Sequence, residues 1–227
     1  MAAGASAPRR SKTFDPGCVR CPRLAAFLAD IHARHPAYWS RPVPAFGTAA
    51  PRILIVGLAP GLHGANRTGR PFTGDFAGIL LYETLHELGL ASRPQSTAVD
   101  DGLALIDARI TNAVKCLPPG NKPLPQEMRC CNSYLRNEFA ALPSVRVILA
   151  LGRVAHEAVL LAYGLKRSAF VFAHSRQHAL DGTRLLIDSY HCSRYNTQTR
   201  RLTATMFKAV VAQACVLAGL GQNGAQV

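Results

Sequence analysis

The sequence predicts an α/β fold, a three-layer α/β/α sandwich around a central, mostly parallel sheet of four strands. Short apolar runs with strand character alternate with segments whose apolar residues recur at helical spacing, which is the pattern of βαβ units. Two of the predicted strands end in loops rich in polar residues and glycine, as strands do at the carboxyl edge of a parallel sheet. Hydrophobic residues make up 48% of the 227 and charged residues 17%, which is typical of a globular protein.

The individual elements follow from apolar runs and from helical periodicity. Buried strands are predicted at 52–58, 109–116, 145–152 and 184–191. Helices are predicted at 22–34, 76–89, 125–141, 153–164 and 199–218. In the helix at 76–89, the residues expected to face inward are Ile79, Leu80, Leu85 and Leu88.

The segments between these elements carry fewer structural signals. Residues 35–51 are rich in proline and are predicted to form a loop. The run at 118–125 cannot be regular, because its prolines remove hydrogen-bond donors and fix φ. The run AFVFAH at 169–174 is a candidate for a further short strand.

We expect one domain over 16–219, with a disordered basic arm at 1–15 and a frayed tail at 220–227. Lys and Arg number 26 against 13 acidic residues, and the formal net charge of +13 makes nucleic acid the first candidate partner. A basic soluble protein without a polyanionic partner is the other interpretation. No apolar run approaches the ~20 residues of a membrane span, and the N-terminus lacks the apolar core of a secretory signal. We therefore expect a cytoplasmic protein, in which the seven cysteines are not disulfides.

The cysteines suggest a metal site. Cys18 and Cys21 form a CxxC turn before the first helix, and Cys116 ends the second predicted strand. Cys130 and Cys131 follow on the next helix. A CxxC turn with distant thiols can make a four-sulfur site, for which zinc and an iron–sulfur cluster are both suitable. The alternative is a set of small buried hydrophobic residues, which free cysteines often are.

The loop after the first strand has the composition of a binding site. Its glycines, among them Gly57 and Gly61, allow close backbone approach to a phosphate or a base, but no P-loop motif is present. Phe72 lies in a glycine-rich loop, where we expect an exposed ring suited to stacking on a base. Asp75 is either a helix N-cap or a site carboxylate, and the two roles are compatible.

A second polar loop follows the last strand. His191 lies at its carboxyl end, where a histidine can act as a general acid or a hydrogen-bond donor. Arg194 and Tyr195 either wedge into a duplex or cap the helix that is expected to begin near Thr199.

Together these motifs resemble the iron–sulfur uracil-DNA glycosylases, specifically their family 5 (type b) branch. The resemblance lies in GLAPGLHGANRTGRPFTGD, TNAVKCLPPGNKPLPQE and SYHCSRYN, and it extends from Cys18 to about Thr203. It implies a structural [4Fe–4S] cluster in an N-terminal segment, and Cys130 is then an ordinary helix residue. The ligands it implies are Cys18, Cys21, Cys116 and Cys131.

The resemblance also implies the chemistry. A uracil, or another deaminated or damaged base such as hypoxanthine or ethenocytosine, is flipped from the duplex and its N-glycosidic bond is hydrolysed. His191 is implied to donate to the base O2, Phe72 to stack on the base and Asn112 to bind its Watson–Crick edge, and Asp75 is our candidate for orienting water. The further residues implied to bind substrate are Gly57, Ala59, Pro60, Gly61 and Asn196. The residues expected to bind DNA are Arg67, Arg70, Lys122, Ser193, Arg194 and Tyr195.

This chain departs from the related motifs at three places. Leu58 and Ala59 stand where most of the superfamily has a polar residue, a gap that the family 5 branch shares. Cys192 replaces a usual proline and would be open to oxidation if exposed. Arg200 stands where glycine is more usual. We expect a monofunctional, monomeric, nucleoid-associated glycosylase, and the alternative is a non-catalytic protein that binds lesions or single strands on the same scaffold.

Overall fold

The computed structural model describes residues 14–221 and contains a six-stranded sheet with the order β1-β3-β2-β4-β6-β5. Its strands are β1 Phe46–Gly47, β2 Ile53–Gly57, β3 Ala108–Asn112, β4 Val147–Leu151, β5 Gln177–Ala179 and β6 Leu185–Ser189. The central strands β3, β2, β4 and β6 are mutually parallel, whereas β1 and β5 pair antiparallel at the two edges. The four predicted strands are therefore the parallel core of the sheet.

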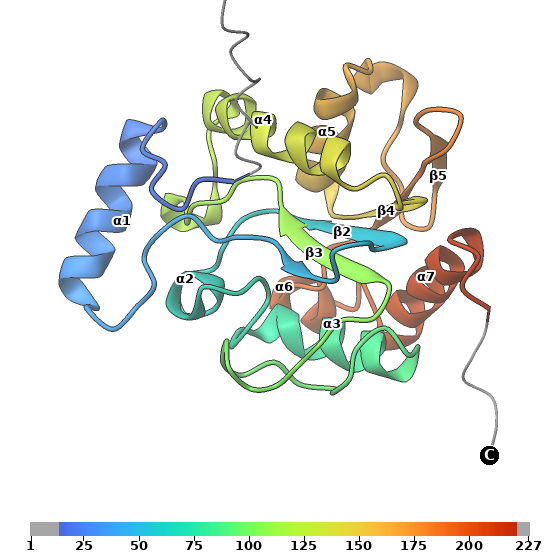
Figure 1. Ribbon diagram of the computed structural model, residues 1–227, viewed down its shortest axis with the longest axis horizontal. Coiled ribbons are helices and arrows are strands. Elements are labelled where there is room, and N and C mark those ends of the chain that lie inside the picture. The colour runs from blue at the N-terminus through green and yellow to red at the C-terminus, as the bar shows by residue number, and fades with distance from the viewer. Residues whose placement is uncertain (1–13, 222–227) are drawn as a thin grey trace, which may run out of the picture.

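Helices cover both faces of the sheet (Figure 1). They are α1 Pro22–Arg34, α2 Ala65–Thr68, α3 Phe76–Glu87, α4 Pro125–Ala141, α5 Arg153–Tyr163, α6 Arg194–Gln198 and α7 Ala204–Leu217, with short 3-10 turns at Pro119–Asn121 and Arg167–Ala169. On one face α3 and α7 bury Leu81 and Phe207, and on the other α4 and α5 bury Leu135 and Val159. Within the described residues, none of the helices is long and apolar enough to cross a membrane.

The prediction of four strands was incomplete at the sheet edges. The run 169–174 is not a strand: Phe170 and Phe172 pack from a loop against His178 and His156, and the edge strand β5 follows at 177–179. The other edge strand, β1, lies inside the proline-rich segment that was predicted to be a loop. Each edge strand pairs with one neighbour and has only two or three residues, which limits the free backbone groups at the sheet edges.

Two helix predictions also need correction. Ile79 is 54% exposed, and Gly78 faces the interior instead, where an added Cβ would lie 1.9 Å from the carbonyl oxygen of Phe72. The helix expected at 199–218 begins later, because Arg200 has a φ of +56° and Thr203 caps α7 by accepting from the amide of Met206. The residues before this break form the separate short helix α6.

The described residues make contacts at both of their ends, close to the predicted boundaries at 15 and 220. Phe14 packs against the ring of Tyr134 at a centroid distance of 5.8 Å, and the amide of Leu220 donates to the carbonyl of Cys215. Most of the predicted arm and tail, at 1–13 and 222–227, lies outside the described residues.

The left-handed backbone at Arg200 leads to a stability prediction. A side chain in this conformation costs about 1–2 kcal/mol, which exceeds the entropy that a glycine loses on folding. We expect Arg200→Gly to raise the melting temperature by about 2 °C, as followed by thermal unfolding. Arg201→Gly is the matched control, because Arg201 has ordinary φ and its guanidinium lies 4.7 Å from the Tyr190 ring centroid. A lower melting temperature in both variants would contradict the proposed backbone strain at Arg200.

Candidate active site and cysteine pocket

The carboxyl ends of β2, β3 and β6 open into one pocket of about 390 Å³, here called the strand-end pocket. Its size suits a small ring-shaped ligand. The predicted site residues that line it are Ala59, Gly61, Phe72, Asp75, Asn112, His191, Ser193 and Arg194. Leu58, Ala65, Phe76, Ala77 and Asn121 also line it, although the motifs did not single them out for this site. The pocket forms because parallel strands bring their following loops to one edge of the sheet.

Phe72 and His191 form one wall of the strand-end pocket. Their rings stack with centroids 5.9 Å apart and an interplanar angle of 28°. Phe72 is only 6% exposed, so the expected exposed ring is instead largely buried. The absence of a side chain at Gly57 permits this, because a Cβ there would lie 2.7 Å from the Phe72 ring. Gly57 therefore shapes the pocket from behind.

Asn112 is the last residue of β3 and is 3% exposed. Its Oδ1 is buried and has no hydrogen-bond partner within the described residues. Buried amides are nearly always paired, so an unpartnered one that lines a pocket is a candidate to bind a ligand. An added Cβ at Gly57 would lie 2.5 Å from this oxygen, so Gly57 also leaves room for the amide.

Part of the His191 residue is accessible, but its ring nitrogen Nδ1 is buried and has no partner within the described residues. Burial lowers its pKa to about 4, so the imidazole is neutral near pH 7. A neutral imidazole can still donate one hydrogen bond. Asn196 was predicted to contact substrate, but its Nδ2 donates to the backbone carbonyl of His191 at 2.8 Å. It therefore anchors the His191 loop and lines a neighbouring pocket with Arg153 and Arg201.

The lowered pKa of His191 makes folding stability dependent on pH. In the unfolded chain its pKa is near 6.5, so below that value the unfolded state binds a proton that the folded state does not. Stability is therefore lost as the pH falls from about 6.5 towards 4. When the pH falls from about 7 to about 5, we expect the free energy of unfolding to decrease by about 1–2 kcal/mol more in the unaltered protein than in His191→Gln. Denaturant unfolding at the two pH values measures this difference. Equal losses would contradict the buried neutral state.

Asp75 is the N-cap of α3, as predicted, and accepts a hydrogen bond from the amide of Gly78 at 2.9 Å. Its other oxygen, Oδ2, faces the loop after β2, where a Cβ on Gly64 would lie 2.4 Å away. Burial raises the pKa of this carboxyl, and the amide hydrogen bonds from Gly78 and Ala77 only partly offset that rise. A carboxylate with a raised pKa is a stronger base than a surface aspartate.

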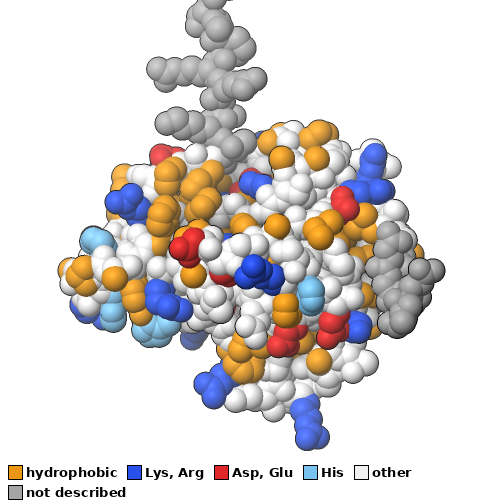
Figure 2. All heavy atoms as spheres, turned by 60° about the horizontal axis from the view of Figure 1, so that its bottom comes forward, with side chains coloured by type: hydrophobic (Ala, Val, Ile, Leu, Met, Phe, Trp, Pro, Cys, Tyr) orange, Lys and Arg blue, Asp and Glu red, His pale blue; other side chains and the backbone are white. Residues whose placement is uncertain are grey.

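The residues predicted to contact DNA divide into accessible and inaccessible ones. Arg70 is 2% exposed and pairs with Asp101 and the Ser96 hydroxyl, so its guanidinium is not available to a phosphate. The accessible residues are Arg67, Lys122, Arg194 and Tyr195. Figure 2 shows Lys and Arg side chains spread over the visible face, without one dense basic patch.

The positions of the remaining residues follow from the local backbone. Ser193 caps α6 by accepting from the amide of Asn196, and Pro60 is buried in the loop after β2. Cys192 is fully buried, so the oxidation expected of an exposed thiol does not apply to it.

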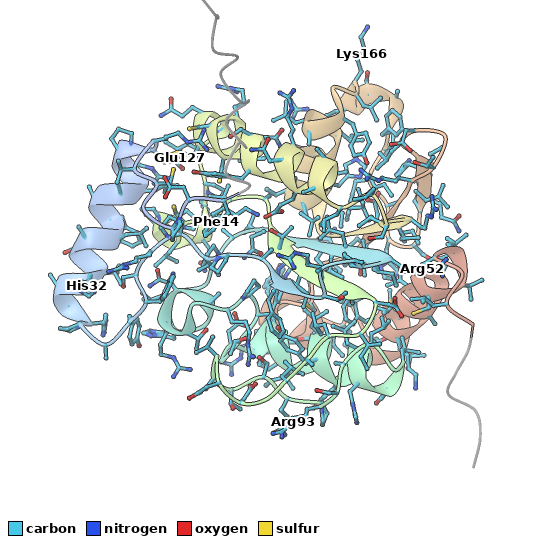
Figure 3. The ribbon with its side chains drawn as sticks, in the orientation of Figure 1. Phe14, His32, Arg52, Arg93, Glu127 and Lys166 are labelled. Carbon is cyan, nitrogen blue, oxygen red and sulfur yellow. The ribbon has the colours of Figure 1, made fainter. Side chains whose placement is uncertain are left out.

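A second pocket gathers five cysteines and is here called the cysteine pocket. It lies between the CxxC turn before α1, the segment after β3 and the helix α4, and sulfur atoms appear there near the labelled Glu127 in Figure 3. The cysteines that line it are Cys18, Cys21, Cys116, Cys130 and Cys131. The CxxC turn is anchored by Arg23, whose guanidinium makes two hydrogen bonds to Glu127 of α4 at 2.7 and 2.8 Å.

The electrostatics of the cysteine pocket differ from thiol to thiol. Burial raises the pKa of Cys116 and Cys131, and together with a hydrogen bond to Cys130 it raises that of Cys21 to about 12. Burial also acts on Cys18, but hydrogen bonds from Tyr134 and Arg20 outweigh it and lower the pKa of that thiol. A bound cation stabilises the thiolate form of a cysteine and so offsets the cost of burying it. Several buried thiols in one pocket are therefore suited to binding a metal.

The spacing of the sulfurs distinguishes a single ion from a cluster. In a tetrahedral zinc site the sulfurs are about 3.8 Å apart, since each Zn–S bond is about 2.3 Å. Within the part of the chain that the structure describes, no three cysteine sulfurs all lie within 4.8 Å of one another. The sulfurs therefore lie farther apart than the ligands of a bound zinc ion.

One set of potential metal ligands elsewhere is a hydrogen-bonded network. His156 and His178 surround Asp188 on β6, with their ligand atoms within 4.8 Å. The two ring nitrogens of His156 face the Asp188 carboxylate at 2.7 Å and the Phe170 carbonyl at 2.9 Å. Each ring nitrogen of His156 therefore already faces a hydrogen-bonding partner, and this accounts for the cluster without a metal. The network fastens the loop after α5 to the sheet.

Comparison with known proteins identifies the family. A family model described as the uracil DNA glycosylase superfamily matches residues 44–215, which include the whole strand-end pocket. A type-5 uracil-DNA glycosylase from Thermus thermophilus is 52% identical over 89% of this chain and 94% of its own length. One from Pyrobaculum aerophilum is 41% identical over 89% of both chains.

The similarity to another branch of the superfamily is more limited. A type-4 uracil-DNA glycosylase from Archaeoglobus fulgidus is 34% identical, over 60% of this chain and 59% of its own. The match to the type-5 proteins is both longer and closer. The chain therefore belongs to the uracil DNA glycosylase superfamily and, within it, to the type-5 uracil-DNA glycosylases.

Proposed function

We propose that this protein is a monofunctional DNA glycosylase of base-excision repair, which removes uracil and leaves an abasic site. Family membership supplies the reaction class. The observation that carries the assignment to this site is the strand-end pocket, where the unpartnered Asn112 amide lies beside the stacked rings of Phe72 and His191. A base that has left the duplex can be held between an aromatic ring and a polar edge contact in such a pocket.

The residues divide the hydrolysis between them. Asn112 binds the Watson–Crick edge of the flipped uracil, and Phe72 stacks on its ring. As the N-glycosidic bond breaks, its electron pair stays on the base, and neutral His191 donates a hydrogen bond to the developing anion at O2. The Asp75 carboxylate orients the attacking water. As the water adds to C1′ of the sugar, Asp75 accepts the proton that it releases. Uracil and the abasic sugar are the products.

We further propose that the cysteine pocket holds a structural [4Fe–4S] cluster on Cys18, Cys21, Cys116 and Cys131. The wide sulfur spacing and the all-thiol donor set support it. Thiolate ligation would tie the CxxC turn to the segment after β3 and to α4, and would supply folding energy to the N-terminal part of the domain. Hydrolysis itself needs no electron transfer.

Bases other than uracil are also proposed substrates. Leu58 and Ala59 both line the strand-end pocket. Their side chains are apolar and cannot select one base by hydrogen bonding. Selection then depends on how easily a mispaired or damaged base leaves the duplex, which favours hypoxanthine and ethenocytosine along with uracil. We propose that the protein acts on these as a monomer.

The test is strand breakage at one labelled uracil in duplex DNA, after alkali treatment, with purified protein and no added metal. Breakage at uracil and at hypoxanthine, but not at cytosine, is the expected result. Protein that is brown and binds the same DNA without breaking it would instead favour the non-catalytic binding protein.

Substitution of Asp75 tests its proposed role in orienting water. Asparagine caps helices nearly as well as aspartate, so Asp75→Asn should keep the melting temperature. The single-turnover rate of uracil release should fall about ten-fold or more, because the amide cannot take a proton. Asp75→Ala serves as the control for the cap, with an expected stability loss of about 1 kcal/mol. An unchanged rate in Asp75→Asn would limit this residue to the N-cap role.

A further inference from the structure

The cysteine pocket contains one thiol more than a [4Fe–4S] cluster needs. We propose that Cys130 is an alternative fourth ligand, which can take the place of Cys131 on the same iron. The inference rests on the proposed cluster and concerns two adjacent residues of α4, both of which line the pocket. Consecutive helix residues point about 100° apart, so two neighbours rarely face one site.

The contacts of Cys130 place its thiol beside the CxxC turn. The Cys130 S–H group donates to the carbonyl oxygen of Arg20 at 3.9 Å, and Arg20 lies between Cys18 and Cys21. Cys130 and Cys21 both line the cysteine pocket. It is half-buried, so it is neither turned fully to solvent nor packed in the core. The sulfur of Cys130 thus lies beside the CxxC turn that carries two of the proposed ligands.

Cys131 lines the same pocket beside the segment after β3. Its sulfur accepts a hydrogen bond from the amide of Lys115 at 3.3 Å, next to Cys116, and the residue is 7% exposed. The CxxC turn and the segment after β3 therefore approach α4 from two directions. Because both thiols line the pocket in which the proposed cluster would sit, a change of side-chain rotamer would let either one serve as its ligand.

The exchange of ligands is balanced without any redox step. If Cys130 replaced Cys131, the Cys130 thiol would give its proton to water on binding iron, and the released Cys131 thiolate would take up a proton. The number of thiolate ligands and the charge of the site would be unchanged. Arg20 assists both forms, since its Nε lies 3.4 Å from the Cys18 sulfur and offsets thiolate charge.

The experiment compares full-length variants purified without oxygen: Cys130→Ala, Cys131→Ala, the double variant and Cys215→Ala. Alanine is used because a serine oxygen can itself bind iron. Cys215 is a matched control, being a buried cysteine on α7 outside the pocket. Iron and sulfide per protein, and visible absorbance, are measured, with circular dichroism to establish folding.

We expect both single variants to keep at least about half of the iron of the unaltered protein and the double variant to lose it at least ten-fold. The inference is overturned if Cys131→Ala is as empty as the double variant, or if Cys130→Ala alone is empty. If Cys131→Ala does not fold, Cys131→Val is used instead, because valine fills more of the space of the buried side chain and cannot bind iron. An unaltered protein without iron and sulfide refutes the proposed cluster itself, which separates that failure from a failure of the exchange.

Alkylation gives a second readout. In the unaltered, cluster-loaded protein the free Cys130 thiol should react with iodoacetamide, whereas in loaded Cys131→Ala it should be at least ten-fold slower, because the iron holds it. Equal rates of Cys130 modification in the two loaded proteins, located by peptide mass, would contradict ligation by Cys130.

Discussion

Replacing His191 with alanine is expected to slow uracil release from duplex DNA about a hundred-fold or more, while affinity for the same DNA holds. The reason is electrostatic: a hydrogen-bond donor aimed at a developing anion contributes most when it is held in a water-poor pocket. His191 meets both conditions, because its ring stacks on Phe72 and its loop is fixed by the bond from Asn196. The measurement is the single-turnover rate at saturating enzyme, with binding followed separately by fluorescence anisotropy.

Two controls separate this role from damage to the pocket. His191→Gln keeps a donor of similar reach and should recover part of the lost rate. Asn196→Ala removes only the anchor of the loop, so its effect on the rate should be smaller than that of His191→Ala. An unchanged rate in His191→Ala, with the fold intact by thermal melting, would remove His191 from the catalytic group and leave the departing base without a donor.

The sequence predicted those parts of the fold whose burial is strong. The central strands are almost entirely buried, and three of them lie within their predicted ranges, whereas β3 begins one residue earlier than predicted, at Ala108. The edge strands were missed because their pairing is imposed by a neighbour: β5 is Gln-His-Ala and β1 is two residues beside prolines. Such strands carry no periodicity that a sequence pattern could detect.

The sequence predicted the location of those site residues whose positions depend only on where a strand ends. Asn112 and His191 end or follow parallel strands, so their meeting at one edge follows from the topology. Arg70 shows the limit, because its partner Asp101 is 31 residues away on an irregular segment. Phe72 shows another: its burial depends on the missing side chain of Gly57 on a different element. Pairings of this kind require the folded chain.

Lys115 and Glu138 form a buried ion pair, and we expect the effects of substituting them on the free energy of unfolding to be strongly coupled. Lys115 is 1% exposed, and its Nζ donates to Glu138 at 2.8 Å and to the Thr111 hydroxyl. Removing either partner leaves an uncompensated buried charge, which costs about 3–5 kcal/mol. We expect Lys115→Met and Glu138→Leu each to lower the melting temperature by about 10 °C.

The double variant distinguishes coupling from simple loss of packing. Methionine and leucine fill much the same space without charge, so Lys115→Met with Glu138→Leu should regain most of the lost stability. The pair joins the end of β3 to α4, and the Lys115 amide also donates to the Cys131 sulfur, so iron content is measured on each variant. A double variant that falls by the sum of the two single effects would mean that the charges do not interact. Recovery of stability without recovery of iron would instead show that Lys115 serves the cysteine pocket through its charge.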